Sequence, residues 1–266
     1  IGEGDHSTLG AVPSGLQASA RLLVKENGII AGLELAGKIF SHIDPKLKII
    51  FFKKDGDEIR IGEEAFIVQG PARSIVTGER LILNCLQRMS GIATYTRKLC
   101  KIIEGTPARL MDTRKTTPNF RMLEKWAVTI GGGMNHRFAL YDMIMLKDNH
   151  VDLAGGVAQA IASTKKYLKE KNKELRIEIE TRSLEEVNQV IEKGGVDVIM
   201  LDNMSLAEMK QAVGRIKGRY KIEASGGITE ANLRSVAECG VDYISVGALT
   251  HSVKSLDLSL KVMMNQ

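Results

Sequence analysis

The strongest constraint on the fold is a repeat in the second half of the chain. Short apolar runs recur there, and their central residues, 22, 23 and 22 positions apart, are Ile177, Ile199, Ile222 and Ile244. That spacing is the length of a minimal strand–helix unit, and repeated units of this kind build a parallel sheet. The sheet could be doubly wound or closed toward a (β/α) barrel. We favour the barrel, because the glycine-rich turn of a doubly wound dinucleotide-binding domain is absent.

The segments between these runs have the apolar spacing of amphipathic helices. We expect helices over Leu153–Lys171, Leu184–Lys193, Leu206–Lys217 and Glu230–Cys239. The last three are expected to begin at hydroxyl side chains that can cap a helix, namely Ser183, Ser205 and Thr229. Two earlier apolar runs, Ala108–Asp112 and Met143–Lys147, are expected to add strands to the same sheet.

The first part of the chain is interrupted by turn signals and predicts a small α+β unit. Strands are expected at Arg21–Lys25, Gly28–Leu35, Ile49–Phe52 and Ala65–Gly70, with a short helix starting at Glu34. Residues 79–104 predict one long helix, or two with a break near Ser90-Gly91. The final segment, Leu256–Met264, is expected to be a helix that returns to this unit.

Composition and charge narrow the possible partners. The chain has 266 residues, 26% of them charged, and a net charge of +5. Only 5% are aromatic, and neither a Lys/Arg block nor a base-stacking motif occurs, so we expect no nucleic-acid partner. No run approaches the ~18 apolar residues of a membrane helix, so we expect no membrane partner. Basic residues gather between positions 114 and 147, which suits a small polyanionic substrate.

The cysteines point to a reducing compartment. Cys85, Cys100 and Cys239 form no CxxC pair, and three thiols cannot all pair with one another. We therefore expect buried free thiols and a cytoplasmic protein.

Polar, charged or small residues end every apolar run. In a barrel, the active site is built at the carboxyl ends of the strands. The residues at these ends are Asp112, Lys147, Glu180, Asp202, Ser225 and Gly247. A barrel built only for stability has no need of this set at one rim, so the sequence predicts a functional site there.

The last two loops have the composition of a phosphate site. Ser225-Gly226-Gly227 precedes a predicted helix, and Gly247 follows the next strand. Glycine lets backbone amides approach an anion closely, and a helix N-terminus favours negative charge. The alternative is a plain turn that needs glycine for a positive φ angle.

Glu180 and Asp202 end neighbouring strands and form a pair of carboxylates. Such a pair suits Mg²⁺ or acid–base chemistry. The alternative is salt bridging to nearby cations. Five possible hydrogen-bond donors for carboxylate or phosphate are Arg114, Lys115, His136, Arg137 and Lys147.

Together, several ordered motifs resemble the quinolinate phosphoribosyltransferase family. They are Arg88-Met-Ser-Gly, Thr113-Arg-Lys-Thr-Thr-Pro, Gly131-Gly-Gly-Met-Asn-His-Arg, Lys147-Asp-Asn-His, Glu178-Ile-Glu180, Met200-Leu-Asp-Asn and Glu223-Ala-Ser-Gly-Gly. The resemblance implies an N-terminal α/β sandwich domain, residues 1–90 plus 252–266, followed by an incomplete (β/α) barrel, residues 91–251. Family chains usually carry a further N-terminal helix, so we expect residues before Ile1.

The reaction implied by the resemblance joins quinolinate to 5-phosphoribosyl 1-pyrophosphate with Mg²⁺. Its products are nicotinate mononucleotide, pyrophosphate and CO₂, at the de novo entry to NAD. The resemblance implies that the quinolinate carboxylates bind to Arg114, His136, Arg137 and Lys147. It places Lys115 near the pyrophosphate, and Glu180 and Asp202 at the Mg²⁺ and ribose end. The implied 5-phosphate site comprises Ser225, Gly226, Gly227, Gly247 and His251.

Two other functions stay open at this point. A related enzyme could act on nicotinate or another pyridine acid without decarboxylation, although the number of cations favours a second carboxylate. The chain could also be a non-catalytic binder of phosphate ligands or nucleic acid. The family resemblance further implies at least a homodimer, in which Arg88 of one subunit completes the site of its neighbour.

Overall fold

A computed structural model describes residues 2–263. The chain divides into two compact units. The first contains the residues up to Arg97, Thr117–Gly132 and the segment from Ser252, and the second contains Lys98–Thr116 and Gly133–His251. The predicted domain boundaries stay a prediction, because compactness does not show that either part folds alone.

The first unit is built on a four-stranded antiparallel sheet in the order β12-β1-β5-β3. Its strands are β1 (Gln17–Val24), β3 (Lys48–Phe51), β5 (Glu64–Pro71) and β12 (Leu258–Met263). A short ladder joins β2 (Gly28–Ile29) to β4 (Glu58–Ile59). The helices of this unit are α1 (His6–Ala11), α2 (Leu33–Ile43), most of α3 (Ala72–Ile102) and α4 (Arg121–Ile130). The core joins alternate residues of β1, such as Leu22, to Phe40 of α2 and Leu86 of α3.

The predicted strand Gly28–Leu35 is wrong beyond its first two residues. Gly32 has a φ angle of 101°, and α2 begins at the next residue. The backbone N–H groups of Gly32 and Leu33 donate to Asp55 Oδ1 at 2.7 and 2.8 Å. The helix N-terminus is thus capped by a side chain distant in sequence, which local periodicity cannot reveal. The short helix expected near Glu34 is confirmed as α2.

Helix α3 is continuous across Ser90-Gly91, so the long-helix reading is confirmed and the break is wrong. Both residues serve packing. Ser90 Oγ accepts a hydrogen bond from Ala31 N at 3.0 Å. Gly91 lies where a Cβ atom would collide with the backbone carbonyl of Lys254. Glycine is needed here for the close approach of another segment, not for a break.

The C-terminal segment returns to the first unit as predicted, but as strand β12 and not as a helix. Its alternate residues Leu258 and Leu260 are buried, and Leu260 lies opposite Leu22 of β1. The period-two series Leu256, Leu258, Leu260 and Val262 was the sequence signal for a strand. Met264, the last residue of the predicted helix, lies outside the described residues.

The second unit holds six parallel strands in the order β6-β11-β10-β9-β8-β7. They are β6 (Arg109–Met111), β7 (Ile144–Leu146), β8 (Ile177–Thr181), β9 (Val198–Asp202), β10 (Lys221–Ser225) and β11 (Tyr243–Ser245). Within residues 2–263, β6 and β7 are sheet edges that do not pair with each other. The predicted incomplete barrel is therefore confirmed.

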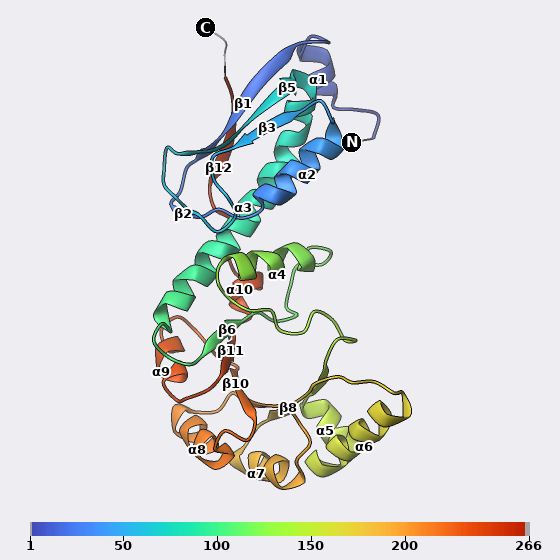
Figure 1. Cartoon of the computed structure of the whole chain (residues 1–266), viewed down its shortest axis with the longest axis vertical. Helices are drawn as coiled ribbons and strands as arrows, with labels where there is room; N and C mark the ends of the chain where they lie inside the picture. The colour runs from blue at the N-terminus through green and yellow to red at the C-terminus, as the bar shows by residue number, and fades with distance from the viewer. Residues whose placement is uncertain (1, 264–266) are drawn as a thin grey trace. The chain divides into compact units, whose positions relative to one another are not determined.

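Helices line the outside of this curved sheet (Figure 1). They are α5 (Asp148–Ala154), α6 (Val157–Glu170), α7 (Leu184–Lys193), α8 (Leu206–Ile216) and α9 (Leu233–Ala237). The short helix α10 (Ala248–His251) follows β11. Ser183 and Ser205 cap α7 and α8 as predicted, accepting from backbone N–H groups at 3.2 and 3.3 Å.

Two helix predictions in this unit need correction. The range Leu153–Lys171 is divided between α5 and α6, because Gly155 and Gly156 adopt φ angles of 88° and 120°. Thr229 does not cap α9. The helix begins only at Leu233, and the Thr229 N–H donates to Asn232 Oδ1 at 2.8 Å in the turn before it.

We predict opposite effects from replacing two helical glycines by alanine. Gly91→Ala should destabilise the protein by about 1–3 kcal/mol, because the new methyl group meets backbone that cannot easily move. Gly214→Ala in α8, where nothing lies within 4 Å of the added atom, should be neutral or stabilising by up to ~1 kcal/mol. Chemical denaturation of both variants tests this, and equal effects would contradict the packing role of Gly91.

Candidate active site

The inner face of the parallel sheet carries the candidate site. Side chains alternate between the two faces of a strand. Outward residues such as Ile179, Leu201 and Ala224 are fully buried. Inward residues line two cavities instead, and those of β8 to β10 are Glu178, Glu180, Val198, Met200, Asp202, Glu223 and Ser225.

The larger cavity, of about 530 Å³, lies at the carboxyl ends of the strands. It brings together most of the site residues predicted from the sequence, namely Arg114, Lys115, His136, Arg137, Lys147, Glu180, Asp202, Ser225, Gly226 and Gly227. Thr113, Met145, Met200, Asn203, Glu223 and Ser245 complete its lining. All of these residues belong to the second unit.

Cations crowd one part of this cavity. Burial lowers the pKa of Arg137, and the neighbouring charge of Arg114 lowers it further. A depressed guanidinium pKa reports a group that is short of water and faces a like charge. An anion bound between the two arginines would relieve both effects. The arrangement therefore suits a ligand with more than one negative charge.

Carboxylates occupy another part of the cavity. The register aligns Glu180 with Met200, so Asp202 lies two residues further along on the same face. Lys147 Nζ lies 3.0 Å from Glu180 Oε2, and the Asn203 side-chain amide donates to Asp202 Oδ2 at 2.8 Å. Glu180 thus forms the salt bridge expected as the alternative, with Lys147. Both carboxylates nevertheless line the cavity.

The loop after β10 depends on its glycines. Gly226 and Gly227 have φ angles of 86° and 60°, and a Cβ on Gly226 would collide with the Asn203 side chain. The Asn203 N–H donates to the Ser225 carbonyl at 2.9 Å, which ties this loop to the end of β9. The backbone of this turn therefore requires glycine at both positions. Phosphate binding by the loop stays a prediction.

Gly247 and His251 do not line the cavity defined by residues 2–263. They lie beside Lys115, which does line the cavity. A Cβ on Gly247 would lie 3.0 Å from His251 Nε2 and 3.2 Å from Lys115 Cδ. The Thr250 hydroxyl donates to the Lys115 carbonyl at 2.8 Å, which holds this segment beside the cavity.

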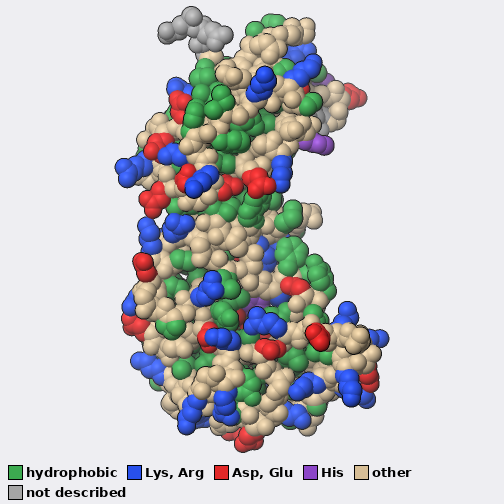
Figure 2. Space-filling view, in the orientation of Figure 1, with side chains coloured by type: hydrophobic (Ala, Val, Ile, Leu, Met, Phe, Trp, Pro, Cys, Tyr) green, Lys and Arg blue, Asp and Glu red, His purple; other side chains and the backbone are tan. Residues whose placement is uncertain are grey.

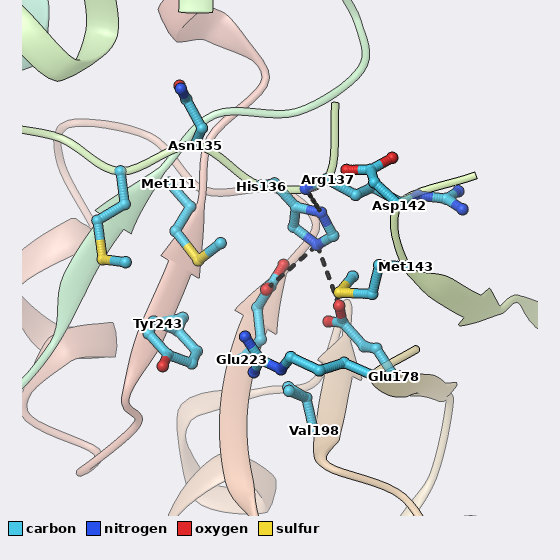
Figure 3. A pocket seen from close by; sticks show the side chains of 12 residues that line it. Met111, Asn135, His136, Arg137, Asp142, Met143, Glu178, Val198, Glu223 and Tyr243 are labelled. Atoms are coloured by element: carbon cyan, nitrogen blue, oxygen red, sulfur yellow. Dashed lines mark hydrogen bonds and ion pairs between the residues drawn. The ribbon is translucent and has the colours of Figure 1, made fainter. Parts of the chain in front are cut away.

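His136 is buried and held by its neighbours. The Asp112 carboxylate accepts the His136 backbone N–H at 2.8 Å, and His136 Nδ1 accepts the Arg137 N–H at 2.7 Å. Because Nδ1 accepts, a neutral ring carries its hydrogen on Nε2. Nε2 lies 3.1 Å from Glu178 Oε2 and 3.5 Å from Glu223 Oε2 (Figure 3). The ring thus lies between the Arg137 backbone and two buried carboxyl groups.

The sequence reasoning did not assign a role to Glu178 or Glu223. Both were quoted only as parts of motifs, yet each is only 1% exposed. Each stands two residues before a predicted site residue, Glu180 or Ser225, and therefore faces the same side of the sheet. The period-two alternation was the signal that could have identified them.

Arg88 lies in the first unit and binds within its own chain. Its Nε and Nη2 donate to Glu124 Oε1 at 3.0 and 2.7 Å, and its Nη1 donates to the Val253 carbonyl at 2.9 Å. Glu124 is fully buried and also accepts from the backbone and hydroxyl of Thr117. The ion pair fixes the position of the Arg88 guanidinium.

The chain was compared with known proteins. Residues 92–261 match the family model described as quinolinate phosphoribosyl transferase, C-terminal domain, and residues 5–90 match the N-terminal domain. These matches and the incomplete barrel place the chain among α/β phosphoribosyltransferases. The chain belongs to the quinolinate phosphoribosyltransferase family.

Individual relatives cover nearly all of the chain. It is 46% identical to the chloroplastic nicotinate-nucleotide pyrophosphorylase [carboxylating] of Arabidopsis thaliana, covering 97% of this chain and 78% of the relative. It is 42% identical to a probable enzyme of the same name from Bacillus subtilis, covering 98% and 89%. The crystal structure of NadC from Streptococcus pyogenes superposes with a TM-score of 0.92 at 41% identity, covering 97% and 90%.

We predict that Gly226→Ala impairs binding of a sugar phosphate. The added methyl group strains a positive φ angle and displaces Asn203, which should weaken ribose 5-phosphate binding by about tenfold or more, as measured by calorimetry. Gly218→Ala is the control, because Gly218 has a φ angle of 73° but nothing within 4 Å of the added atom. Equal affinities of the two variants for ribose 5-phosphate would show that this loop is not part of the phosphate site.

Proposed function

We propose that this protein transfers the phosphoribosyl group of 5-phosphoribosyl 1-pyrophosphate to quinolinate, with loss of CO₂, in NAD biosynthesis. The products are nicotinate mononucleotide, pyrophosphate and CO₂. The observation that carries the proposal is family membership over nearly the whole chain, combined with a cavity that places clustered cations beside two carboxylates.

The acceptor would bind among the cations. Quinolinate carries two carboxylates, and guanidinium groups bind carboxylates with bidentate geometry. Arg114 and Arg137 supply such groups, and Lys147 supplies a third cation. A monocarboxylate needs fewer cations, so this set favours a diacid over nicotinate.

The donor would bind toward the glycine loop and the carboxylates. Its 5-phosphate would lie against Ser225, Gly226 and Gly227. Gly247 and His251 would complete this site from beside Lys115. Lys115 would approach the pyrophosphate. Mg²⁺ would be held by Glu180 and Asp202, whose carboxylate oxygens are the ligand type this ion prefers. When bound, Mg²⁺ neutralises charge on the leaving pyrophosphate.

The chain's own residues account for the two chemical stages. The cations orient the acceptor so that its ring nitrogen faces the anomeric carbon. As the pyrophosphate leaves, positive charge grows on the ribose, and the negative charge of Glu180 and Asp202 stabilises it. The positive charge of the resulting pyridinium nitrogen then stabilises the electron pair that stays on the adjacent ring carbon when CO₂ leaves, so no lysine Schiff base is required.

Release of CO₂ from carboxyl-labelled quinolinate tests this function. The protein should release label only when 5-phosphoribosyl 1-pyrophosphate and Mg²⁺ are present, and it should form little mononucleotide from nicotinate. Equal turnover of nicotinate would favour the alternative enzyme that acts without decarboxylation. A protein that binds these ligands without turnover would be a binder only.

We also place this protein in the cytoplasm or another reducing compartment. Its three cysteines are free thiols, two of them buried. Among residues 2–263, no helix combines the length and hydrophobicity needed to cross a membrane. On the face in Figure 2, Lys and Arg are interspersed with Asp and Glu, which is unlike the uniform basic surface typical of nucleic-acid binders.

We predict that Arg137→Ala weakens quinolinate binding by about 2–4 kcal/mol, the range for losing one partner of a desolvated charge pair. Lys147→Ala should have a similar effect. Stability should fall little for Arg137→Ala, because the change ends the burial of a charge and its repulsion with Arg114, which outweigh the lost attraction to Glu178 and Asp142. Calorimetry and thermal melts measure the two effects, with Lys169→Ala on the exposed face of α6 as the control. A large melting loss with unchanged affinity would make Arg137 a structural residue.

We further propose a homodimer in which Arg88 completes the neighbouring subunit's site. Because Glu124 would be left as a buried charge, Arg88 is best removed together with it, as Arg88→Met with Glu124→Gln. Co-expression with a Lys147→Ala subunit should give mixed dimers with one intact site. Random pairing should then restore about a quarter of wild-type activity. If mixed dimers form but activity does not recover, Arg88 does not act in the neighbouring subunit's site.

A further inference from the structure

Glu223 lines both of the cavities described above. It lines the larger cavity with Arg137 and Lys147, and it also lines a second cavity of about 250 Å³ nearer the amino ends of the strands. Among the lining residues of that second cavity, Asn135, Asp142 and Arg176 are exposed, so it reaches solvent. In Figure 3 the Glu223 carboxyl group points toward the His136 ring.

The surroundings of Glu223 favour its neutral form. Burial raises the pKa of Glu223 well above its ordinary value, and the negative charge of Glu178 raises it further. A hydrogen bond from Ser245 and the charge of Lys147 act in the opposite direction with smaller effect. A buried carboxyl group that stays neutral near pH 7 can donate a proton, as known enzymes exploit.

The two oxygens of Glu223 have different surroundings. Oε2 lies 3.5 Å from His136 Nε2, whereas Oε1 is buried and has no hydrogen-bond partner among the described residues. A buried polar atom without a partner is costly and calls for an explanation. Because the Glu223 side chain lines the larger cavity, a ligand that reached this oxygen from the cavity would provide one.

The reaction proposed above requires a proton at this place. When the carboxylate on the carbon next to the ring nitrogen leaves as CO₂, its bonding electron pair stays on that carbon. A new C–H bond must then form. Arginine cannot give up a proton near neutral pH. Of the residues lining the larger cavity, Glu223 alone combines near-complete burial with a carboxyl pKa that is raised.

We propose that Glu223 is the general acid that protonates the ring carbon after CO₂ leaves, an inference that rests on the proposed function. The O–H bond of Glu223 breaks, its proton forms the new C–H bond with the electron pair left on carbon, and the carboxylate remains. A water proton taken up through the second cavity restores the neutral acid. His136 Nε2 lies 3.5 Å from this acid, and its Nδ1 accepts the Arg137 backbone N–H, so the acid and Arg137 flank the same ring.

A single-turnover experiment with carboxyl-labelled quinolinate tests Glu223. The Glu223→Gln variant keeps the size of the side chain and its ability to donate a hydrogen bond, but it cannot transfer a proton. Pyrophosphate formation should stay close to the wild-type rate, while formation of decarboxylated product should slow by roughly 10²-fold. When no proton arrives, the carbanion recombines with CO₂ before CO₂ escapes, so quinolinate mononucleotide should accumulate.

Glu178→Gln is the matched control. Glu178 is equally buried and contacts the same His136 nitrogen, but it does not line the larger cavity. The variant removes the charge of Glu178 but leaves burial, the larger cause of the raised pKa of Glu223, in place. Pyrophosphate and CO₂ should therefore still appear in step. If they also stay in step in Glu223→Gln, or if mononucleotide accumulates equally in both variants, Glu223 is not the acid.

An infrared measurement keeps the proposal testable if Glu223→Gln does not fold. At pH 7 the wild-type protein should show the carbonyl stretch of a protonated carboxyl group, and absence of that band overturns the proposal. The outcomes separate the two claims. A wild-type protein that releases no CO₂ contradicts the proposed function, whereas CO₂ release with an unaffected Glu223→Gln variant contradicts this inference alone.

Discussion

The candidate site depends on the two-residue alternation of side chains along the parallel strands. In β8, Ile177 and Ile179 face the helices, and Glu178 and Glu180 face the cavities. Burial of the outward apolar residues fixes the register, because a slip of one residue would exchange the two faces. The hydrophobic packing that stabilises the sheet therefore also sets the positions of the inward polar groups.

The electrostatic design follows from this arrangement. The cavity holds cations and carboxylates on a rigid scaffold, and Lys147 links the two kinds of group through Glu180. Buried groups below the cavity hold the cationic part in place. Asp112 binds the His136 backbone, and the His136 ring binds the Arg137 backbone. The buried contacts of Asp112 and His136 thus set the position of Arg137, whose guanidinium is partly removed from water.

Local patterns predicted much of this structure. The strand–helix spacing predicted the parallel sheet, and the strand ends predicted most residues of the larger cavity. What local patterns could not show were contacts between distant segments. Asp55 starts α2, and the Lys254 carbonyl explains Gly91 in an unbroken helix. Strand β12 and the inward position of Glu178 and Glu223 are different, because a period-two alternation in the sequence already indicates them.

The central prediction is that the larger cavity, at the carboxyl ends of these strands, binds a dicarboxylate. A crystal structure of the protein with quinolinate tests it most directly. We predict that the two carboxylates contact Arg114, Arg137 and Lys147 in the larger cavity, with the ring close to Glu223. Quinolinate bound outside this cavity, or with its carboxylates directed toward Glu180 and Asp202, would contradict the account.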